Sequence, residues 1–126
     1  MDNSTTTNNQ EVGKQGESLA VTFLEQNGYT ILETNWRFGQ SEADIICKKK
    51  GELVFVEVKT RGTDKFGYPE RAVTKQKQRQ YQFLAEGYIQ KNKLTMDVRF
   101  DIISIVHHFP EPEIVHIKDA FYPTNF

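Results

Sequence analysis

A glutamate and a lysine stand near the end of an otherwise apolar stretch, LVFVEVKTR, at residues 53–61. Side chains alternate between the two faces of a β-strand, so Glu57 and Lys59 share one face with Leu53 and Phe55. The other face carries only Val and Thr, which predicts a strand covered on both sides. A buried charge without a partner is costly. Glu57 and Lys59 therefore form a buried ion pair, or they belong to a site that uses their charges.

An aspartate precedes this strand at a spacing that could bring it close. Asp44 lies in the short apolar segment 43–47, with twelve residues between it and Glu57. The intervening segment 48–52, KKKGE, predicts a hairpin turn that contains a glycine. A five-residue turn places Asp44 opposite Val56, one position from direct registry with Glu57. A bulge or a looser turn would then bring the two carboxylates onto one face.

Two converging carboxylates would supply the hard oxygen ligands that Mg²⁺ or Mn²⁺ requires. Such ions are commonly held by one or two carboxylates together with substrate phosphate. The ammonium of Lys59 would lie about 6–7 Å along the strand from Glu57. From there it could orient an attacking water or neutralise negative charge developing on a phosphoryl group. The spacing therefore predicts a metal-dependent site that acts on a phosphate, and the simple Glu57–Lys59 ion pair stays as its alternative.

The surrounding pattern predicts the elements that would position these side chains. Apolar residues at helical spacing predict helices over residues 12–27 and from Pro69 or Thr74 to about Lys91. The buried stripe of the second helix is predicted as Tyr81, Leu84, Ala85 and Tyr88. Strands are predicted over residues 29–38, 43–47, 53–60, 96–106 and 113–117. This order indicates an α/β fold with a mixed central sheet flanked by helices.

Composition favours one globular domain. The chain has 126 residues, of which 37% are hydrophobic and 26% charged, which is typical of a soluble domain with a real core. The Ser/Thr/Asn-rich residues 1–10 predict a disordered tail, leaving 11–126 as the domain. No basic start followed by an apolar run and no long apolar stretch occurs. We therefore expect a cytoplasmic protein without a membrane partner.

Charge is unevenly distributed along the chain, although the net charge is only −1. Residues 59–93 carry nine Lys/Arg and three Asp/Glu, whereas residues 1–47 carry seven acids and two basic residues. A basic segment beside an acidic site would suit a protein that handles phosphates. The candidate nucleic-acid-binding residues are Arg61, Lys75, Lys77 and Arg79. The alternative is a solvated helix face.

Five motifs together resemble a known family. They are GKQGE at residues 13–17, SEAD at 41–44, FVEVKTR at 55–61, FGYP at 66–69 and RFDIISI at 99–105. The chain from about residue 11 to 122 resembles the YraN-type family of small uncharacterised bacterial proteins. That family is related to the Holliday-junction-resolvase and RecB branches of the PD-(D/E)xK nucleases.

The resemblance implies a restriction-endonuclease-like core, with the element order αβββαβ. It also implies that Glu17, Asp44 and Glu57 are metal ligands and that, with Lys59, they form the catalytic set. The sequence departs from the superfamily pattern at Ala43, where the proline would stand, and at Ser41, where the family has glycine. Neither change removes a functional group.

The second helix separates this chain from RecB-type nucleases. Those enzymes carry a Gln-x-x-x-Tyr spacing, whereas Lys77 stands four residues before Tyr81 here. This favours the resolvase-like branch. The expected activity is Mg²⁺-dependent endonuclease cleavage of DNA, especially branched DNA, by a protein that would act as a homodimer to cut two strands. The alternative is a non-catalytic nucleic-acid-binding or adaptor protein, which the acidic pI of about 6.3 favours.

One further acid is predicted to be structural. Asp101 lies inside the apolar segment RFDIISI. We expect it to be buried near the second helix and paired with a lysine or an arginine, because a buried carboxylate needs such a partner.

Overall fold

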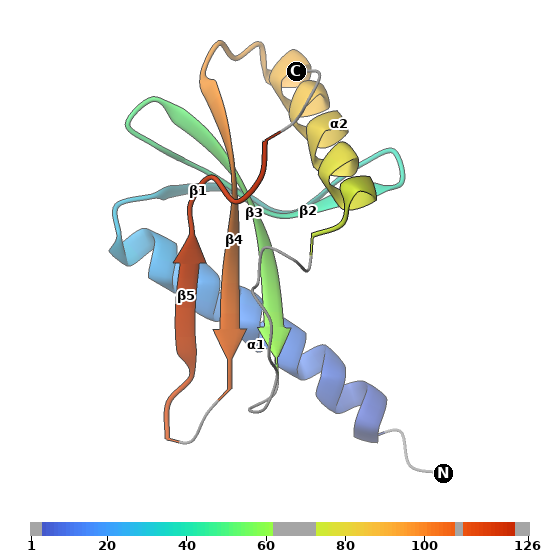
Figure 1. Cartoon of the computed structure of the whole chain (residues 1–126), viewed down its shortest axis with the longest axis vertical. Helices are drawn as coiled ribbons and strands as arrows, with labels where there is room; N and C mark the ends of the chain where they lie inside the picture. The colour runs from blue at the N-terminus through green and yellow to red at the C-terminus, as the bar shows by residue number, and fades with distance from the viewer. Residues whose placement is uncertain (1–3, 62–72, 108–109, 123–126) are drawn as a thin grey trace.

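Three strands follow the first helix and two follow the second, in the order that the sequence predicts (Figure 1). The computed structural model describes residues 4–61, 73–107 and 110–122, with side chains described from residue 13 onward and not at residue 61. The elements are α1 (Ser4–Gln26), β1 (Thr30–Phe38), β2 (Ser41–Lys49), β3 (Glu52–Arg61), α2 (Lys75–Asn92), β4 (Asp97–Val106) and β5 (Glu113–Ile117). This order confirms the mixed α/β fold and is consistent with a nuclease-like core.

The strands β1 to β5 join one mixed sheet in the order β1-β2-β3-β4-β5. Strands β3 and β4 are parallel, whereas the other neighbouring pairs are antiparallel. A parallel pair needs a crossover connection, and α2 lies in the segment that joins β3 to β4. Strand β3 therefore occupies the centre of the sheet, as its predicted burial on both faces requires.

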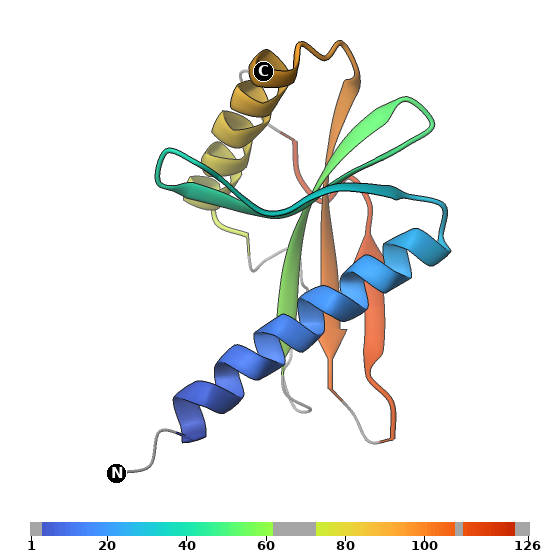
Figure 2. The same ribbon diagram turned by 180° about the vertical axis from the view of Figure 1, so that it is seen from behind.

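The two helices cover opposite faces of the sheet (Figures 1 and 2). Val54 and Val56 of β3 belong to the apolar cluster beneath α1. Leu53 and Phe55 belong to the cluster beneath α2. All four side chains are fully buried. The alternation predicted for this strand is confirmed, and each face of β3 is sealed by a different helix.

Helix α1 is longer than the sequence pattern predicts. It begins at Ser4, whereas the pattern places its start at Val12 after a disordered tail over residues 1–10. Ser, Thr and Asn each disfavour a helix by no more than about 0.7 kcal/mol relative to Ala, so an existing helix can extend through them at small cost. The single domain over residues 11–126 stays a prediction.

Helix α1 passes very close to β3 at Gly16. A Cβ atom at this position would overlap the Oγ1 atom of Thr60, so only glycine allows the helix to lie this close. The next helical residue is Glu17, and the residue before Thr60 is Lys59. The close approach therefore brings the first predicted site residue toward the end of β3.

The turn between β2 and β3 is shorter than predicted. The strands pair up to their ends and leave only Lys50 and Gly51 as the turn. Both have a left-handed backbone, with φ angles of 52° and 83°, as a tight hairpin turn of this hand requires. The predicted five-residue turn is wrong, and Val56 pairs with Ile45 instead of Asp44.

Helix α2 begins where the sequence predicts. Thr74 is its N-cap, and the hydroxyl of Thr74 accepts the backbone N–H of Lys77 at 3.1 Å. The predicted stripe is buried: Tyr81, Leu84, Ala85 and Tyr88. The alternative start at Pro69 lies outside the described residues. In the described segments, neither helix is long and apolar enough to cross a membrane.

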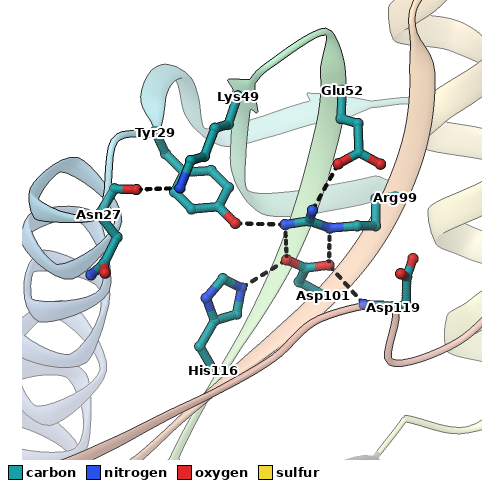
Figure 3. A network of polar contacts seen from close by, with 8 residues as sticks. All are labelled: Asn27, Tyr29, Lys49, Glu52, Arg99, Asp101, His116 and Asp119. Carbon is teal, nitrogen blue, oxygen red and sulfur yellow. Dashed lines mark hydrogen bonds and ion pairs between the residues drawn. The ribbon is translucent and has the colours of Figure 1, made fainter.

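A buried polar network surrounds Asp101 on the α1 face of the sheet (Figure 3). The Asp101 carboxylate is fully buried and accepts hydrogen bonds from Arg99 at 2.8 and 2.9 Å. The backbone N–H of Asp119 donates to it at 3.1 Å, and His116 Nε2 lies 2.7 Å away. Burial alone would raise the pKa of Asp101, but the hydrogen bonds of His116 and Arg99 hold it below its usual value.

Arg99 extends this network to β3 and to the short connection between α1 and β1. Its guanidinium donates to the Tyr29 hydroxyl at 2.7 Å and to the Glu52 carboxylate at 2.9 Å. The predicted pairing of Asp101 with an arginine is confirmed, but its predicted place near the second helix is wrong. Asp101 pairs in register with Val56, so it shares the face that Val56 turns toward α1.

The network predicts a large effect of Asp101→Asn on stability. The substitution removes the negative charge that holds Arg99 and His116, and leaves the largely buried Arg99 paired with the more exposed Glu52 carboxylate. We expect the free energy of unfolding, measured by urea denaturation, to fall by about 3 kcal/mol or more. The control is Glu42→Gln, which breaks an ion pair with the exposed Arg37 and should cost less than about 1 kcal/mol. Equal losses in both variants would contradict this account.

Candidate active site

Asp44 and Glu57 occupy neighbouring positions on β2 and β3. The last pair at this end of the ladder is Ile45 with Val56, so the next positions along the two strands are Asp44 and Glu57. The Asp44 carboxylate accepts the backbone N–H of Val58 at 2.8 Å, which holds it against β3. The two-residue turn thus produces the approach that the sequence analysis expected only from a bulge or a looser turn.

The Glu57 carboxylate is only 5% exposed and is compensated on both of its oxygens. Oε1 accepts a hydrogen bond from the Tyr81 hydroxyl at 2.5 Å. Oε2 lies 3.3 Å from the Lys59 ammonium and 3.8 Å from the Lys77 ammonium. The ion pair that the sequence analysis kept as an alternative is therefore present, but it is part of a larger arrangement with a second lysine and a tyrosine.

Tyr81 of α2 connects the two acids, and the sequence analysis missed this role. Its hydroxyl oxygen lies 3.5 Å from the backbone N–H of Asp44 while the hydroxyl donates to Glu57. Burial, together with the charges of Asp44 and Glu57, raises the pKa of Tyr81 well above its usual value, so the group stays a neutral donor. Its position four residues after Lys77 was the available signal, because such residues share one helix face.

The Asp44 carboxyl has an unusually high pKa. Burial is the largest cause, and the neighbouring charges of Glu57 and Glu17 add to it, raising the pKa from 3.8 to about 7. The hydrogen bond from Val58 and the charge of Lys77 oppose this rise without cancelling it. Asp44 is therefore a carboxyl group whose ionised form lacks compensation, which is common in functional sites.

Glu17 lies beside this pair without joining it closely. Its carboxylate accepts a hydrogen bond from the Asn35 side-chain amide at 3.0 Å. It is near enough to Asp44 to raise the pKa of that group. In the described segments, no three His, Cys, Asp or Glu side chains gather closely enough to hold a metal ion together. The structure thus brings Asp44, Glu57 and Lys59 together and leaves Glu17 at the edge of the site.

The predicted nucleic-acid-binding residues fall into three situations. Lys77 points into the site and contacts Glu57. Lys75 and Arg79 lie exposed on α2. The Arg61 side chain lies outside the described residues, so its predicted role rests on the sequence. The basic segment therefore divides into one lysine in the site and two basic residues on the adjoining surface.

The donor set fits a small divalent cation in its chemistry. Asp44 and Glu57 offer carboxylate oxygens from adjacent strands, and Mg²⁺ commonly uses only one or two carboxylates together with water and phosphate. A cation here would also favour the ionised form of Asp44, whose pKa is raised to about 7 by burial and by the two nearby acids. In the described part of the chain no three His, Cys, Asp or Glu side chains form a metal cluster, but Mg²⁺ held by two carboxylates, water and phosphate does not require one.

Fold and site together define a small α/β protein with a mixed five-stranded sheet, in which a buried glutamate and a half-buried aspartate lie beside a lysine. The sequence profile of "Uncharacterised protein family UPF0102" matches residues 16–105. The chain belongs to this family, which confirms the YraN-type resemblance.

Proteins of known sequence from several bacteria are similar to it along almost their whole length. A UPF0102 protein of Bacteroides fragilis is 46% identical over 115 residues, covering 91% of this chain and 95% of that protein. One from Geobacter metallireducens is 46% identical over 114 residues, covering 90% and 93%. A UPF0102 protein of Flavobacterium psychrophilum is 45% identical over 112 residues, covering 89% and 94%. The family match includes all four residues of the predicted catalytic set.

The raised pKa of Asp44 predicts that Asp44→Asn stabilises the protein above neutral pH. Between pH 3.8 and about pH 7 the folded protein keeps a proton on the Asp44 carboxyl, whereas the unfolded chain releases it. The free energy of unfolding therefore falls as the pH rises through this range. Asn keeps an oxygen for the Val58 N–H and avoids the fall. We expect a gain on the order of 1–3 kcal/mol near pH 8 in urea denaturation, vanishing toward pH 4.

The matched control for this experiment is Asp97→Asn, because Asp97 is exposed at the start of β4. That variant should stay within about 0.5 kcal/mol of the wild type at both pH values. An Asp44→Asn protein that is no more stable than the wild type near pH 8 would show that the crowded acids impose no cost on the fold.

Proposed function

We propose that the protein is a metal-dependent endonuclease that hydrolyses phosphodiester bonds in DNA. The observation that carries the proposal is the arrangement around Glu57, whose carboxylate contacts Lys59, Lys77 and Tyr81 and lies beside the crowded Asp44. A structural ion pair requires one acid and one base. A second acid with a raised pKa is a cost to the fold that a catalytic site explains. Branched or otherwise structured DNA is the proposed substrate, on the strength of the resolvase-like resemblance.

Asp44 and Glu57 would hold the Mg²⁺ or Mn²⁺ ion, with Glu17 approaching from α1 as a third ligand. Such an ion, when bound, supplies an activated water and neutralises charge on the scissile phosphate. The protein's own part is to aim the carboxylates. Val58 holds Asp44 through its backbone N–H, and Tyr81 holds one oxygen of Glu57, while the other faces Lys59 and Lys77.

The two lysines supply positive charge to the reacting phosphate. The side chains of Lys59 and Lys77 are 31% and 36% exposed, so both ammonium groups reach the surface beside the buried Glu57. In the proposed mechanism Lys59 stabilises the charge that develops on the phosphoryl oxygens in the transition state. Lys77 holds the adjoining backbone phosphate, and the exposed Lys75 and Arg79 extend this contact along α2.

A second candidate function is a non-catalytic DNA-binding or adaptor protein on the same fold. One observation favours it: Glu57 is already compensated by two ammonium groups and a hydroxyl, as expected of a finished structural cluster. The raised pKa of Asp44 speaks against it, because a binding protein gains nothing from crowding an acid there. The two functions differ in whether the lysine and the aspartate are needed for turnover or only for folding.

The proposal predicts that Lys59→Gln and Asp44→Ala each lower DNA cleavage by at least about 100-fold, the usual cost of losing one group that stabilises a developing charge. Cleavage would be measured on single-stranded, duplex and four-way-junction DNA with Mg²⁺ and with Mn²⁺. Thermal unfolding of each variant would show that the fold is intact. Junction DNA should be cleaved fastest by the wild type.

Lys91→Gln is the matched control, because Lys91 is an exposed lysine in the last turn of α2, far along the helix from Lys77. It should cleave like the wild type. A wild-type protein that cleaves no form of DNA with either ion would overturn the nuclease proposal and favour the adaptor. Cleavage that survives in both Lys59→Gln and Asp44→Ala would do the same, since it would come from another source.

A further inference from the structure

Asn35 has an unusual backbone conformation in the middle of β1. Its φ angle is 52°, in the left-handed region, which few residues other than glycine adopt although asparagine tolerates it better than most. Its neighbours keep regular pairing with β2: Thr34 pairs with Ile45 and Trp36 with Ala43. Asn35 therefore stands across from Asp44, between two regular pairs.

The Asn35 side chain makes one described hydrogen bond, and that bond goes to a predicted site residue. Its amide nitrogen donates to Glu17 Oε1 at 3.0 Å, linking β1 to α1. The bond is exposed to solvent, so it adds little to the stability of the fold. A left-handed backbone destabilises a strand, and an exposed hydrogen bond does not offset that strain. Strained residues of this kind are common at functional sites.

The surface above this pair is hollow. Two adjoining cavities of about 490 and 570 Å³ are both lined by Lys14, Glu17 and Asn35. The Glu17 carboxylate is therefore accessible from outside while one of its oxygens is held. A carboxylate has two oxygens with lone pairs on each, so an amide donor on Oε1 leaves Oε2 available to another partner.

We propose that Asn35 is a positioning residue that orients the Glu17 carboxylate toward Asp44 for a shared divalent cation. The left-handed backbone directs the amide at Glu17 from the strand position opposite Asp44. Partners that orient a metal ligand in this way commonly change metal affinity by about 10–100-fold when removed. This inference rests on the proposed metal site, and it adds a residue to it that the family resemblance does not assign.

The test is a double-mutant cycle in Mn²⁺ affinity, measured by titration calorimetry on the wild type, Asn35→Gly, Glu17→Gln and the double variant. Glycine accepts the left-handed backbone without strain, so the fold should be kept and its thermal unfolding confirms this. We expect Asn35→Gly to weaken Mn²⁺ binding by about 10-fold or more. The double variant should bind no more weakly than Glu17→Gln alone, because Asn35 acts only through Glu17.

Lys50→Gly controls for the backbone change, because Lys50 has the same φ angle of 52° in the exposed β2–β3 turn. It should bind Mn²⁺ like the wild type. The inference is overturned if Asn35→Gly binds Mn²⁺ as tightly as the wild type, or if adding Asn35→Gly to Glu17→Gln weakens Mn²⁺ binding further. In either case the proposed function still stands if Mn²⁺ binding by the wild type is lost in Asp44→Ala. A wild type that binds no Mn²⁺ overturns both.

Discussion

The compensation of one buried carboxylate governs the arrangement of this protein's polar site. Glu57 is 5% exposed, and a carboxylate so far removed from water requires partners worth several kcal/mol. Lys59 comes from the same strand, whereas Lys77 and Tyr81 come from α2. The position of α2 against the sheet is therefore tied to the charge at the end of β3. Anything that changes the partners of Glu57 also acts on the helix that carries Lys77.

A buried aspartate, Asp101, and a half-buried one, Asp44, differ in how fully their negative charge is compensated. Asp101, on the α1 face, accepts hydrogen bonds from Arg99 and the backbone and contacts His116. These contacts outweigh its burial and lower its pKa. Asp44, on the α2 face, has one backbone donor and an acidic neighbour, Glu57, and its pKa rises to about 7. The fold thus compensates the charge of Asp101 and leaves the charge of Asp44 poorly compensated.

The sequence predicted what depends on periodicity and missed what depends on single turns. Strand alternation was enough to place Glu57 and Lys59 on one face, between two apolar layers. The register of Asp44 depended on Lys50, a non-glycine residue with a left-handed backbone, which no sequence rule requires. Tyr81 was assigned to the apolar stripe of α2 because helical periodicity predicts which face is buried. The pattern carries no information about the partner of the Tyr81 hydroxyl. The contact between Tyr81 on α2 and Glu57 on β3 depends on how the helix packs against the sheet, which the sequence pattern does not give.

The central claim is that Asp44 and Glu57 form one divalent-cation site. Anomalous diffraction from crystals grown with Mn²⁺ tests it most directly, because the signal locates the ion itself. The account predicts an anomalous peak about 2.1 Å from one carboxylate oxygen of each residue, with Lys59 moved away from Glu57. A map without a peak between these two carboxylates, with Glu57 still paired to Lys59 and Lys77, would contradict it.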